Sequence, residues 1–321
     1  MKIALIGPGI ISIPPPGWGA VEILIYDYYL SLKELNHEVD IINPIRKNNR
    51  ESSTPNCKYI KNFIQTINRG NYDLVHFHYD VHFHMFDKIK AKKIAITSHY
   101  PYIDQIDKHK NDGYDKIFNF LVRNDKYYHF VLADKDIKVL LEKGAKKEFI
   151  FKLNNGIKCD QFKFYQQPKY KEKSIYLGKI DQRKNQYKYQ SINNIEFVGP
   201  YSNSNFNTDL DNYLGKWNRE DIYKNLGNYS NLILLSTGEA DPLVIKEALV
   251  CGLGIVTNQT SGENLDKNKP FINIIPDDKL DDLKYIENIL EKNREISLKM
   301  RKEISDYGRE IFDIKKQVEN Y

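Results

Sequence analysis

The sequence predicts an α/β protein made of two successive units, each with a parallel sheet that helices cover on both faces. Short apolar runs alternate with helical patterns along most of the 321 residues, as in chains of repeated strand-helix units. Continuous rather than alternating apolar strands indicate burial on both faces. Charged residues make up 28% and hydrophobic residues 41% of the chain, and its length is sufficient for two cores.

The first unit, expected over residues 1–160, contains five predicted strands. Two helical patterns, Ala20–Leu35 and Asp136–Lys143, fall between some of them. The strands are Lys2–Ile6, Val39–Ile42, Leu74–His78, Ile94–Thr97 and Tyr128–Leu132.

A linker is expected near residues 160–173, where the segment Gln166–Lys173 is polar. The second unit, residues 161–299, then follows, and a charged helical pattern runs from about Leu280 to the end. Its predicted strands are Ile175–Leu177, Ile195–Val198, Leu232–Leu235, Gly254–Thr257 and Ile272–Ile275.

Composition narrows the function classes. The net charge of +5 is modest, and lysine clusters such as Lys88–Lys93 are expected to be solvated faces. Attraction to an acidic acceptor or to a membrane surface is the alternative. No aromatic and basic motif accompanies the charge, which disfavours nucleic-acid binding. No apolar run approaches the roughly 18 residues of a membrane span. Three scattered cysteines and an N-terminus that reads as a strand predict a cytoplasmic location.

A helix is predicted to begin after Glu239 and to end near Gly252. Asp241 is a suitable N-cap, and Pro242 suits the first helical position, where its missing N–H costs nothing. Glycine is a common residue just past a helix end. An ordinary buried helix following a strand is the alternative interpretation.

Two carboxylates, Glu239 and Glu247, stand eight residues apart around this predicted helix start. The first-turn amides of Leu243 and Val244 have no intrahelical partner and favour an anion. Carboxylates that accept from hydroxyls, beside a helix end that favours phosphate, suit a sugar nucleotide.

A glycine-rich loop precedes the helix predicted to begin near Ala20. Gly17 and Gly19 let backbone amides approach a phosphate closely at a helix N-terminus. The loop lacks the G-x-G-x-x-G pattern, and no Walker lysine follows it. A plain strand-to-helix turn is the alternative.

Histidines cluster near the ends of two predicted strands. His76 and His78 share one strand face, and His82 and His84 follow closely, which raises a metal site as a minor hypothesis. His99 ends another strand and is a candidate donor to a substrate oxygen. For the first four, the expectation is that one histidine near the strand end faces a ligand while the others are structural. A satisfied core histidine is the alternative for His99.

Basic residues follow the strand that ends at Leu177. Lys179 and Lys184 are placed to neutralise a diphosphate. Exposed surface lysines are the alternative.

Taken in order along the chain, these pieces resemble the retaining nucleotide-sugar glycosyltransferases of the GT-B class, glycosyltransferase family 4. Besides the glycine loop, the two lysines and the Glu239–Glu247 pair, the resemblance includes Leu35–Val39, Asp73–His78, Thr97–His99 and Asn155–Ile157. It extends over nearly the whole chain.

The resemblance implies two Rossmann-like domains facing across a cleft, with the acceptor on the first and the donor on the second. A C-terminal helix, about residues 300–321, is implied to pack back on the first domain. Glu239, His99 and Lys184 are implied as catalytic residues. The implied donor-binding residues are Gly17, Gly19, Lys179, Lys184, Glu239, Leu243, Val244 and Glu247.

The implied reaction moves a hexosyl or N-acetylhexosaminyl group from a UDP- or GDP-linked donor to an acceptor hydroxyl, with retention and without metal or cofactor. The acceptor is a glycan, a lipid-linked molecule or a small molecule. Lys179 stands where the family usually has arginine, and Pro242 where it often has glycine. A GT-B epimerase, a phosphorylase or a catalytically silent carbohydrate-binding protein remains an alternative, and a histidine-based metallohydrolase is a third.

Overall fold

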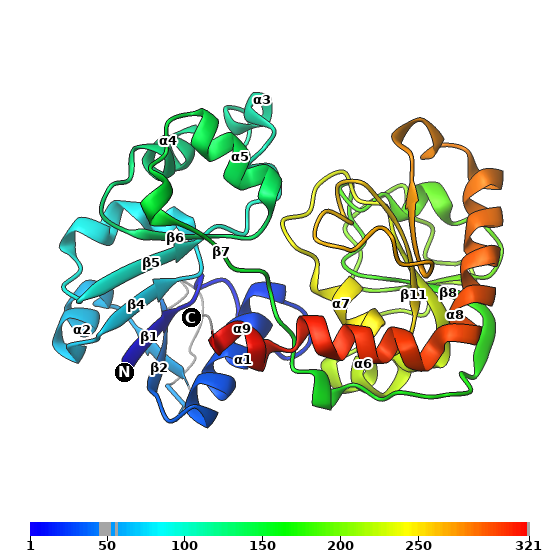
Figure 1. The fold of residues 1–321 in the computed structure, drawn as a ribbon, viewed down its shortest axis with the longest axis horizontal. Helices are drawn as coiled ribbons and strands as arrows, with labels where there is room; N and C mark the ends of the chain where they lie inside the picture. The colour runs from blue at the N-terminus through cyan, green and yellow to red at the C-terminus, as the bar shows by residue number, and fades with distance from the viewer. Residues whose placement is uncertain (45–52, 55–56, 320–321) are drawn as a thin grey trace. The chain divides into compact units, whose positions relative to one another are not determined.

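The structure is a computed structural model that describes residues 1–44, 53–54 and 57–319. The chain forms two compact units (Figure 1). Unit 1 consists of Met1–Asn155 together with Ile314–Tyr321, and unit 2 consists of Gly156–Asp313. The division falls at Asn155–Gly156, within the motif Asn155–Ile157 and five residues before the predicted boundary at 160.

Unit 1 contains a seven-stranded sheet in the order β3-β2-β1-β4-β5-β6-β7. All its strand pairs are parallel, which confirms the predicted sheet type. The strands are β1 (Lys2–Ile6), β2 (Glu38–Pro44), β3 (Cys57–Ile60), β4 (Leu74–Phe77), β5 (Lys93–Thr97), β6 (Tyr128–Val131) and β7 (Ile150–Lys152).

Helices connect these strands and supply the apolar core beside the sheet. Phe77 of β4 packs with Phe86 and Phe118 from two of the connecting helices in one buried cluster. The connecting helices are α1 (Ala20–Glu34), α2 (Phe63–Gly70), the 3₁₀ segment η1 (Asp80–Lys88), α3 (Ile106–His109), α4 (Asp115–Arg123), α5 (Asp134–Glu142) and the 3₁₀ turn η2 (Lys147–Phe149).

Unit 2 contains a five-stranded parallel sheet in the order β12-β11-β10-β8-β9. Its strands are β8 (Tyr170–Leu177), β9 (Ile195–Val198), β10 (Tyr229–Leu234), β11 (Gly254–Asn258) and β12 (Ile272–Ile275). Its helical elements are η3 (Cys159–Gln161), η4 (Gln186–Tyr189), α6 (Arg219–Asn225), η5 (Leu226–Asn228), α7 (Leu243–Val250), η6 (Asp277–Lys279) and α8 (Leu283–Phe312).

The C-terminal segment is divided between the two units. The long helix α8 packs on α7 and on the sheet of unit 2. The short helix α9 (Ile314–Glu319) lies beside α1 in unit 1 (Figure 1), where Lys315 pairs with Glu34 at 3.0 Å. Of the helix predicted at about 300–321, residues up to Phe312 therefore belong to unit 2, and the last two residues lie outside the described part.

Two strands and one stretch of β8 differ from the prediction. β3 and β7 were not predicted, because they are edge strands whose outer residues are partly exposed and lack a continuous apolar run. β8 begins at Tyr170, inside the expected linker. Its first residues are polar because Lys171 and Glu172 are exposed, whereas the second half of the strand is fully buried.

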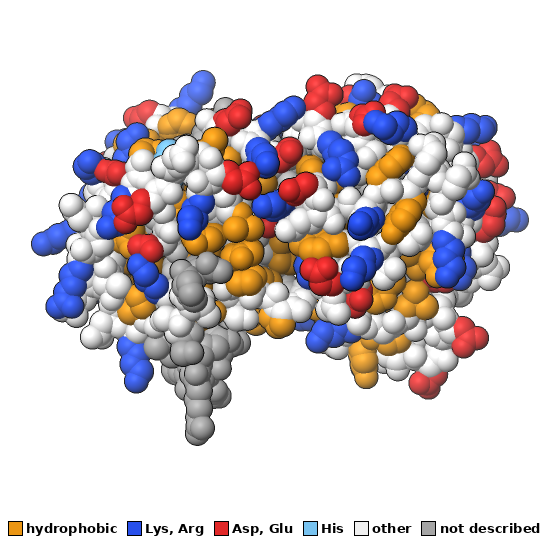
Figure 2. Space-filling view, turned by 90° about the horizontal axis from the view of Figure 1, so that it is seen from below, with side chains coloured by type: hydrophobic (Ala, Val, Ile, Leu, Met, Phe, Trp, Pro, Cys, Tyr) orange, Lys and Arg blue, Asp and Glu red, His pale blue; other side chains and the backbone are white. Residues whose placement is uncertain are grey.

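The described surface agrees with the modest net charge. On the face drawn in Figure 2, cationic and anionic side chains are interspersed rather than gathered by sign. None of the described helices combines the length and the apolar character that crossing a bilayer requires.

Candidate functional site

The strand order of unit 2 reverses between β8 and β10. β9 lies on one side of β8, while β10, β11 and β12 follow on the other side. In open parallel sheets, ligands bind beyond the carboxyl ends of the strands at this reversal. Two of the predicted site segments leave the sheet here, since Gly178–Lys184 follows β8 and Glu239 follows β10.

Glu239 lies at this strand reversal, and two cationic side chains contact one of its carboxylate oxygens. Lys184 Nζ donates to Glu239 Oε1 at 2.6 Å, and Arg183 Nη1 lies 2.8 Å from the same atom. The Glu239 side chain is only 10% exposed. Burial alone would raise the pKa of Glu239, but the two cations outweigh it and hold the pKa below its usual value. Glu239 is therefore an ionised hydrogen-bond acceptor at neutral pH.

Backbone contacts fix the two segments to one another. The buried Tyr176 hydroxyl accepts from Leu235 N at 3.0 Å and donates to the carbonyl of Lys184. Thr237 N donates to the carbonyl of Arg183 at 2.9 Å. The turn that bears both cations is thus hydrogen-bonded to the segment that leads to Glu239.

The end of β8 is shaped by glycine. A Cβ placed on Gly178 would lie 3.2 Å from Cδ and 3.3 Å from Cε of Lys184, so the lysine stem packs directly over this glycine. Lys179, the next residue, is exposed to solvent. The structure therefore brings Lys184 to Glu239, whereas Lys179 is an exposed point charge at the same strand end.

The start of α7 differs from the prediction. The helix begins at Leu243 with Pro242 in the cap position, and no described side chain caps it. Asp241 is not the N-cap, because its carboxylate is used elsewhere. Lys246 Nζ lies 2.5 Å from Oδ2 of Asp241, and Asn264 Nδ2 donates to Oδ1 at 2.9 Å. The helix ends at Val250 before Gly252, as predicted.

This arrangement leaves the first turn of α7 without a side-chain cap, and anion binding there stays a prediction. The amides of Leu243 and Val244 lie in the first turn, where no intrahelical acceptor exists. Asp241 does not compete for them by capping, and its charge is balanced by a buried lysine.

Glu247 lies further along α7 and has a cation of its own. Arg219, the first residue of α6, places Nη2 2.6 Å from Oε1 of Glu247. The same guanidinium stacks over the Tyr223 ring at 4.7 Å and the Phe162 ring at 5.3 Å. Burial alone would lower the pKa of Arg219, but Glu247 reverses this and raises it. The two predicted glutamates therefore contact different cations.

Sequence position alone assigned no role to Arg183 or Arg219. Arg183 stands directly before a predicted lysine, and that adjacency was the available signal. Arg219 lies 28 residues before Glu247 in a polar segment, and nothing in the sequence links the two.

In unit 1 the strand order reverses between β1 and β4. The glycine loop follows β1, and α1 begins at Ala20, as predicted. Gly19 has a φ of 137°, and a Cβ there would lie 2.2 Å from Ile11 Cδ1, so only glycine fits. The buried Glu22 carboxylate stands beside it, 2.8 Å from the same Cβ position. The Glu22 side chain therefore lies close to this helix start, and phosphate binding by Gly17 and Gly19 stays a prediction.

His76 in β4, His78 directly after it and His99 after β5 pack together. The rings of His76 and His78 lie 4.0 Å apart, and His99 stacks on His78 at 6.0 Å. Burial lowers the pKa of His99 to about 4, so its ring is neutral at pH 7. A neutral His99 ring can take part in a hydrogen bond but carries no charge, and its catalytic role stays a prediction. Among the described residues, no three His, Cys, Asp or Glu side chains are arranged to hold a metal ion.

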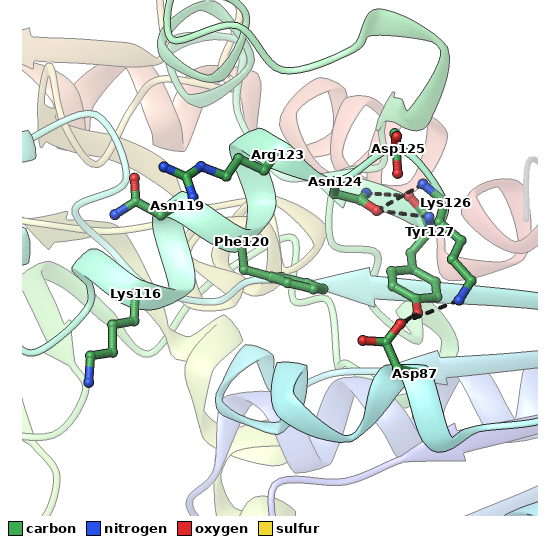
Figure 3. A pocket seen from close by; sticks show the side chains of 9 residues that line it. All are labelled: Asp87, Lys116, Asn119, Phe120, Arg123, Asn124, Asp125, Lys126 and Tyr127. Atoms are coloured by element: carbon green, nitrogen blue, oxygen red, sulfur yellow. Dashed lines mark hydrogen bonds and ion pairs between the residues drawn. The ribbon is translucent and has the colours of Figure 1, made fainter.

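A pocket of about 430 Å³ lies elsewhere in unit 1, between α4 and η1 (Figure 3). Tyr127 in its wall directly precedes β6, so the pocket is at the amino edge of the sheet. Tyr127 donates to Asp87 at 2.7 Å, and Lys126 also contacts this carboxylate. The pocket is therefore at the opposite edge from the loops that follow β1, β4 and β5.

Solved structures of similar fold cover the whole chain. Sucrose-phosphate synthase from Thermosynechococcus elongatus aligns with 100% of this chain and 97% of its own, at a TM-score of 0.74 and 14% identity. Anabaena HepE, in a crystal structure with UDP and glucose, aligns with 100% of this chain and 98% of its own, at 0.71 and 15%. The chain has the GT-B fold.

A third structure with this fold is WaaG, a glycosyltransferase involved in lipopolysaccharide biosynthesis. It covers 99% of this chain and 98% of its own, at a TM-score of 0.74 and 13% identity. No protein-family model and no curated protein sequence matches the chain. Structural matches at this level of sequence identity show the fold alone, and they confirm the predicted GT-B architecture. They do not show a reaction.

Proposed function

We propose that this GT-B protein is a retaining glycosyltransferase that moves a sugar from a nucleoside diphosphate donor to an acceptor hydroxyl. The observation that carries the proposal is the buried contact of Glu239 with Lys184 at the strand reversal of unit 2. There, the Glu239 carboxylate, which can accept from sugar hydroxyls, is hydrogen-bonded to the Lys184 ammonium, which can pair with phosphate. HepE, a protein of the same fold, has been crystallised with UDP-glucose.

The chemistry requires a stabilised leaving group. As the bond between sugar and diphosphate breaks, negative charge grows on the phosphate oxygen, and fixed cations and amides lower the barrier. Lys184 and the first-turn amides of Leu243 and Val244 supply such groups, with Lys179 as a further charge. Because cations of the chain itself perform this task, we propose a reaction that needs no metal ion.

The two glutamates take different parts of the donor in this proposal. Glu239 accepts from hydroxyls of the transferred sugar. Glu247, held by Arg219 through Oε1, accepts from ribose hydroxyls through its second oxygen. His99, Gly17 and Gly19 of unit 1 are assigned to the same reaction by the resemblance, with the neutral His99 ring as a hydrogen-bonding group.

The experiment is a panel of UDP- and GDP-linked hexoses and N-acetylhexosamines, assayed for nucleotide release with and without simple acceptors. We expect one donor to be hydrolysed slowly, and Glu239→Ala to lower that rate at least about tenfold by removing transition-state contacts. The control is Glu303→Ala on the exposed side of α8, which should keep the wild-type rate. Wild-type rates in Glu239→Ala would contradict the assignment of this site.

Two further measurements address stereochemistry and metal. NMR of the product should show the anomeric configuration of the donor, and inversion would contradict a retaining reaction. Rates should persist after EDTA treatment. Binding of a nucleotide sugar with no turnover on any acceptor would favour the catalytically silent alternative.

A further inference from the structure

Glu239 Oε1 has two cationic neighbours, Arg183 and Lys184, although one would balance its charge. The two strand-end segments hold three cations, Lys179, Arg183 and Lys184, and two carboxylates, Asp181 and Glu239. The count leaves one positive charge in excess. Lys184 and Glu239 are each 10% exposed, whereas Arg183 is 29% exposed and Lys179 is exposed, so the excess lies on the solvent side of this group, where it can pair with an anionic ligand.

The two cations are not equivalent. Lys184 is 10% exposed and its stem is packed over Gly178, whereas the Arg183 side chain is 29% exposed. The backbone of Arg183 is fixed, since its carbonyl accepts from Thr237 N. Arg183 Nη1 also donates to the carbonyl of Gly238. When the side chain turns toward solvent, the turn itself stays in place and Lys184 stays at Glu239, but Arg183 gives up this backbone contact as well.

We propose, resting on the function proposed above, that Arg183 binds the donor diphosphate by exchanging Glu239 for a phosphate. When sugar hydroxyls occupy Glu239, the guanidinium leaves its Oε1 and pairs with phosphate oxygens. Lys184 keeps Glu239 ionised during the exchange. A guanidinium matches two phosphate oxygens at once, which an ammonium cannot do. Arg183 thus supplies the planar grip that Lys179, a point charge, does not provide.

The first test compares ligands that differ only in phosphate. Calorimetry measures the binding of UDP or GDP, whichever the wild type binds, of the matching nucleoside, and of inorganic pyrophosphate. Arg183→Gln should weaken binding of the nucleoside diphosphate and of pyrophosphate at least about tenfold and leave nucleoside binding unchanged. Arg183→Lys should be intermediate. The control is Lys188→Gln, an exposed lysine paired with Asp281, which should bind as the wild type does.

A second test examines the exchange itself. In Glu239→Gln the resting partner of Arg183 loses its charge, so the affinity for the nucleoside diphosphate without sugar should rise several-fold. The double variant Arg183→Gln, Glu239→Gln should lose that gain. An unchanged affinity in Glu239→Gln would contradict the exchange.

The outcomes separate this inference from the proposed function. If the wild type binds nucleotide and Arg183→Gln binds it equally well, the role of Arg183 is wrong and the proposed function is unaffected. If Arg183→Gln loses the nucleoside and the nucleoside diphosphate alike, Arg183 is structural and the inference is also wrong. If the wild type binds none of these ligands, both proposals fall.

Discussion

The ammonium of Lys184 lies 2.6 Å from Oε1 of Glu239, across 55 residues of sequence. The two residues meet because β8 and β10 are parallel neighbours, so the segments that follow them leave the sheet at the same edge. Burial and the second cation, Arg183, keep the carboxylate ionised.

Tyr176→Phe should disturb the site without touching a charge. The lost hydroxyl leaves the amide of Leu235 and the carbonyl of Lys184 without their buried partner, at a cost of about 1–3 kcal/mol. We expect lower stability in urea unfolding and weaker nucleotide binding. Tyr201→Phe is the control, since Tyr201 is 57% exposed. Equal behaviour of the two variants would show that the Tyr176 hydroxyl holds nothing in place.

Gly199→Ala should destabilise unit 2 strongly. A Cβ there would lie 1.9 Å from the carbonyl oxygen of Gly178, and the φ of Gly199 is 151°. We expect a loss above about 2 kcal/mol from overlap and backbone strain together. The matched control is Gly215→Ala, where φ is also positive but no atom lies within 4 Å. Thermal unfolding compares the two variants, and equal losses would show that the overlap at Gly199 adds nothing.

Asp241→Asn should be costly because it leaves Lys246 charged and buried. Both side chains are nearly inaccessible to solvent, and breaking such a pair costs about 3–5 kcal/mol. Replacing both residues, Asp241→Leu with Lys246→Met, should recover much of the loss. The exposed pair Lys302–Asp306 is the control, and Lys302→Met should change stability by less than about 1 kcal/mol. Denaturant unfolding of the wild type and of these three variants decides this.

Glu247→Gln should weaken nucleotide binding more than turnover. The amide group replaces one of the two accepting oxygens, so the side chain can no longer accept from both Arg219 and a ribose hydroxyl as the carboxylate does, and Arg219 loses its ion-pair partner. We expect KM for the donor to rise at least about tenfold while kcat changes less. A kcat effect as large as that of Glu239→Ala would show that Glu247 acts on the transferred sugar instead.

Acid should destabilise unit 1 through its buried histidines. Burial lowers the pKa of His78 well below its usual value and that of His129 to about 3. A lowered pKa means that the unfolded state binds the proton first as the pH falls. The stability that these neutral histidines contribute is therefore fully present above a pH of about 6.5 and decreases as the pH is lowered further. His129→Leu should reduce the slope of melting temperature against pH between 7 and 5. His84→Gln, at an exposed residue, should not change it.

Much of the architecture could be predicted from local pattern. Central strands such as β1 and β10 are continuous apolar runs, because both faces of a parallel sheet are buried. The edge strand β7 escaped prediction because only one side of it meets the sheet. Gly19 and Gly252 were recognisable because positive φ at a helix boundary favours glycine.

The partners of the charged residues were harder to predict. Asp241 has the residue type and position of an N-cap, yet Lys246 and Asn264 hold its carboxylate. A cap is a local interaction worth about 1 kcal/mol, and a buried lysine overrides it because a lone buried charge costs more.

The sequence by itself determined the two parallel α/β units and the presence of acidic and basic residues at strand ends, because apolar periodicity and glycine positions are local properties. Only the tertiary structure decided which charges meet. Arg183 and Lys184 share Glu239, while Arg219 holds Glu247. These pairings depend on strand order and register, which bring distant segments together and bury them where each charge requires a partner.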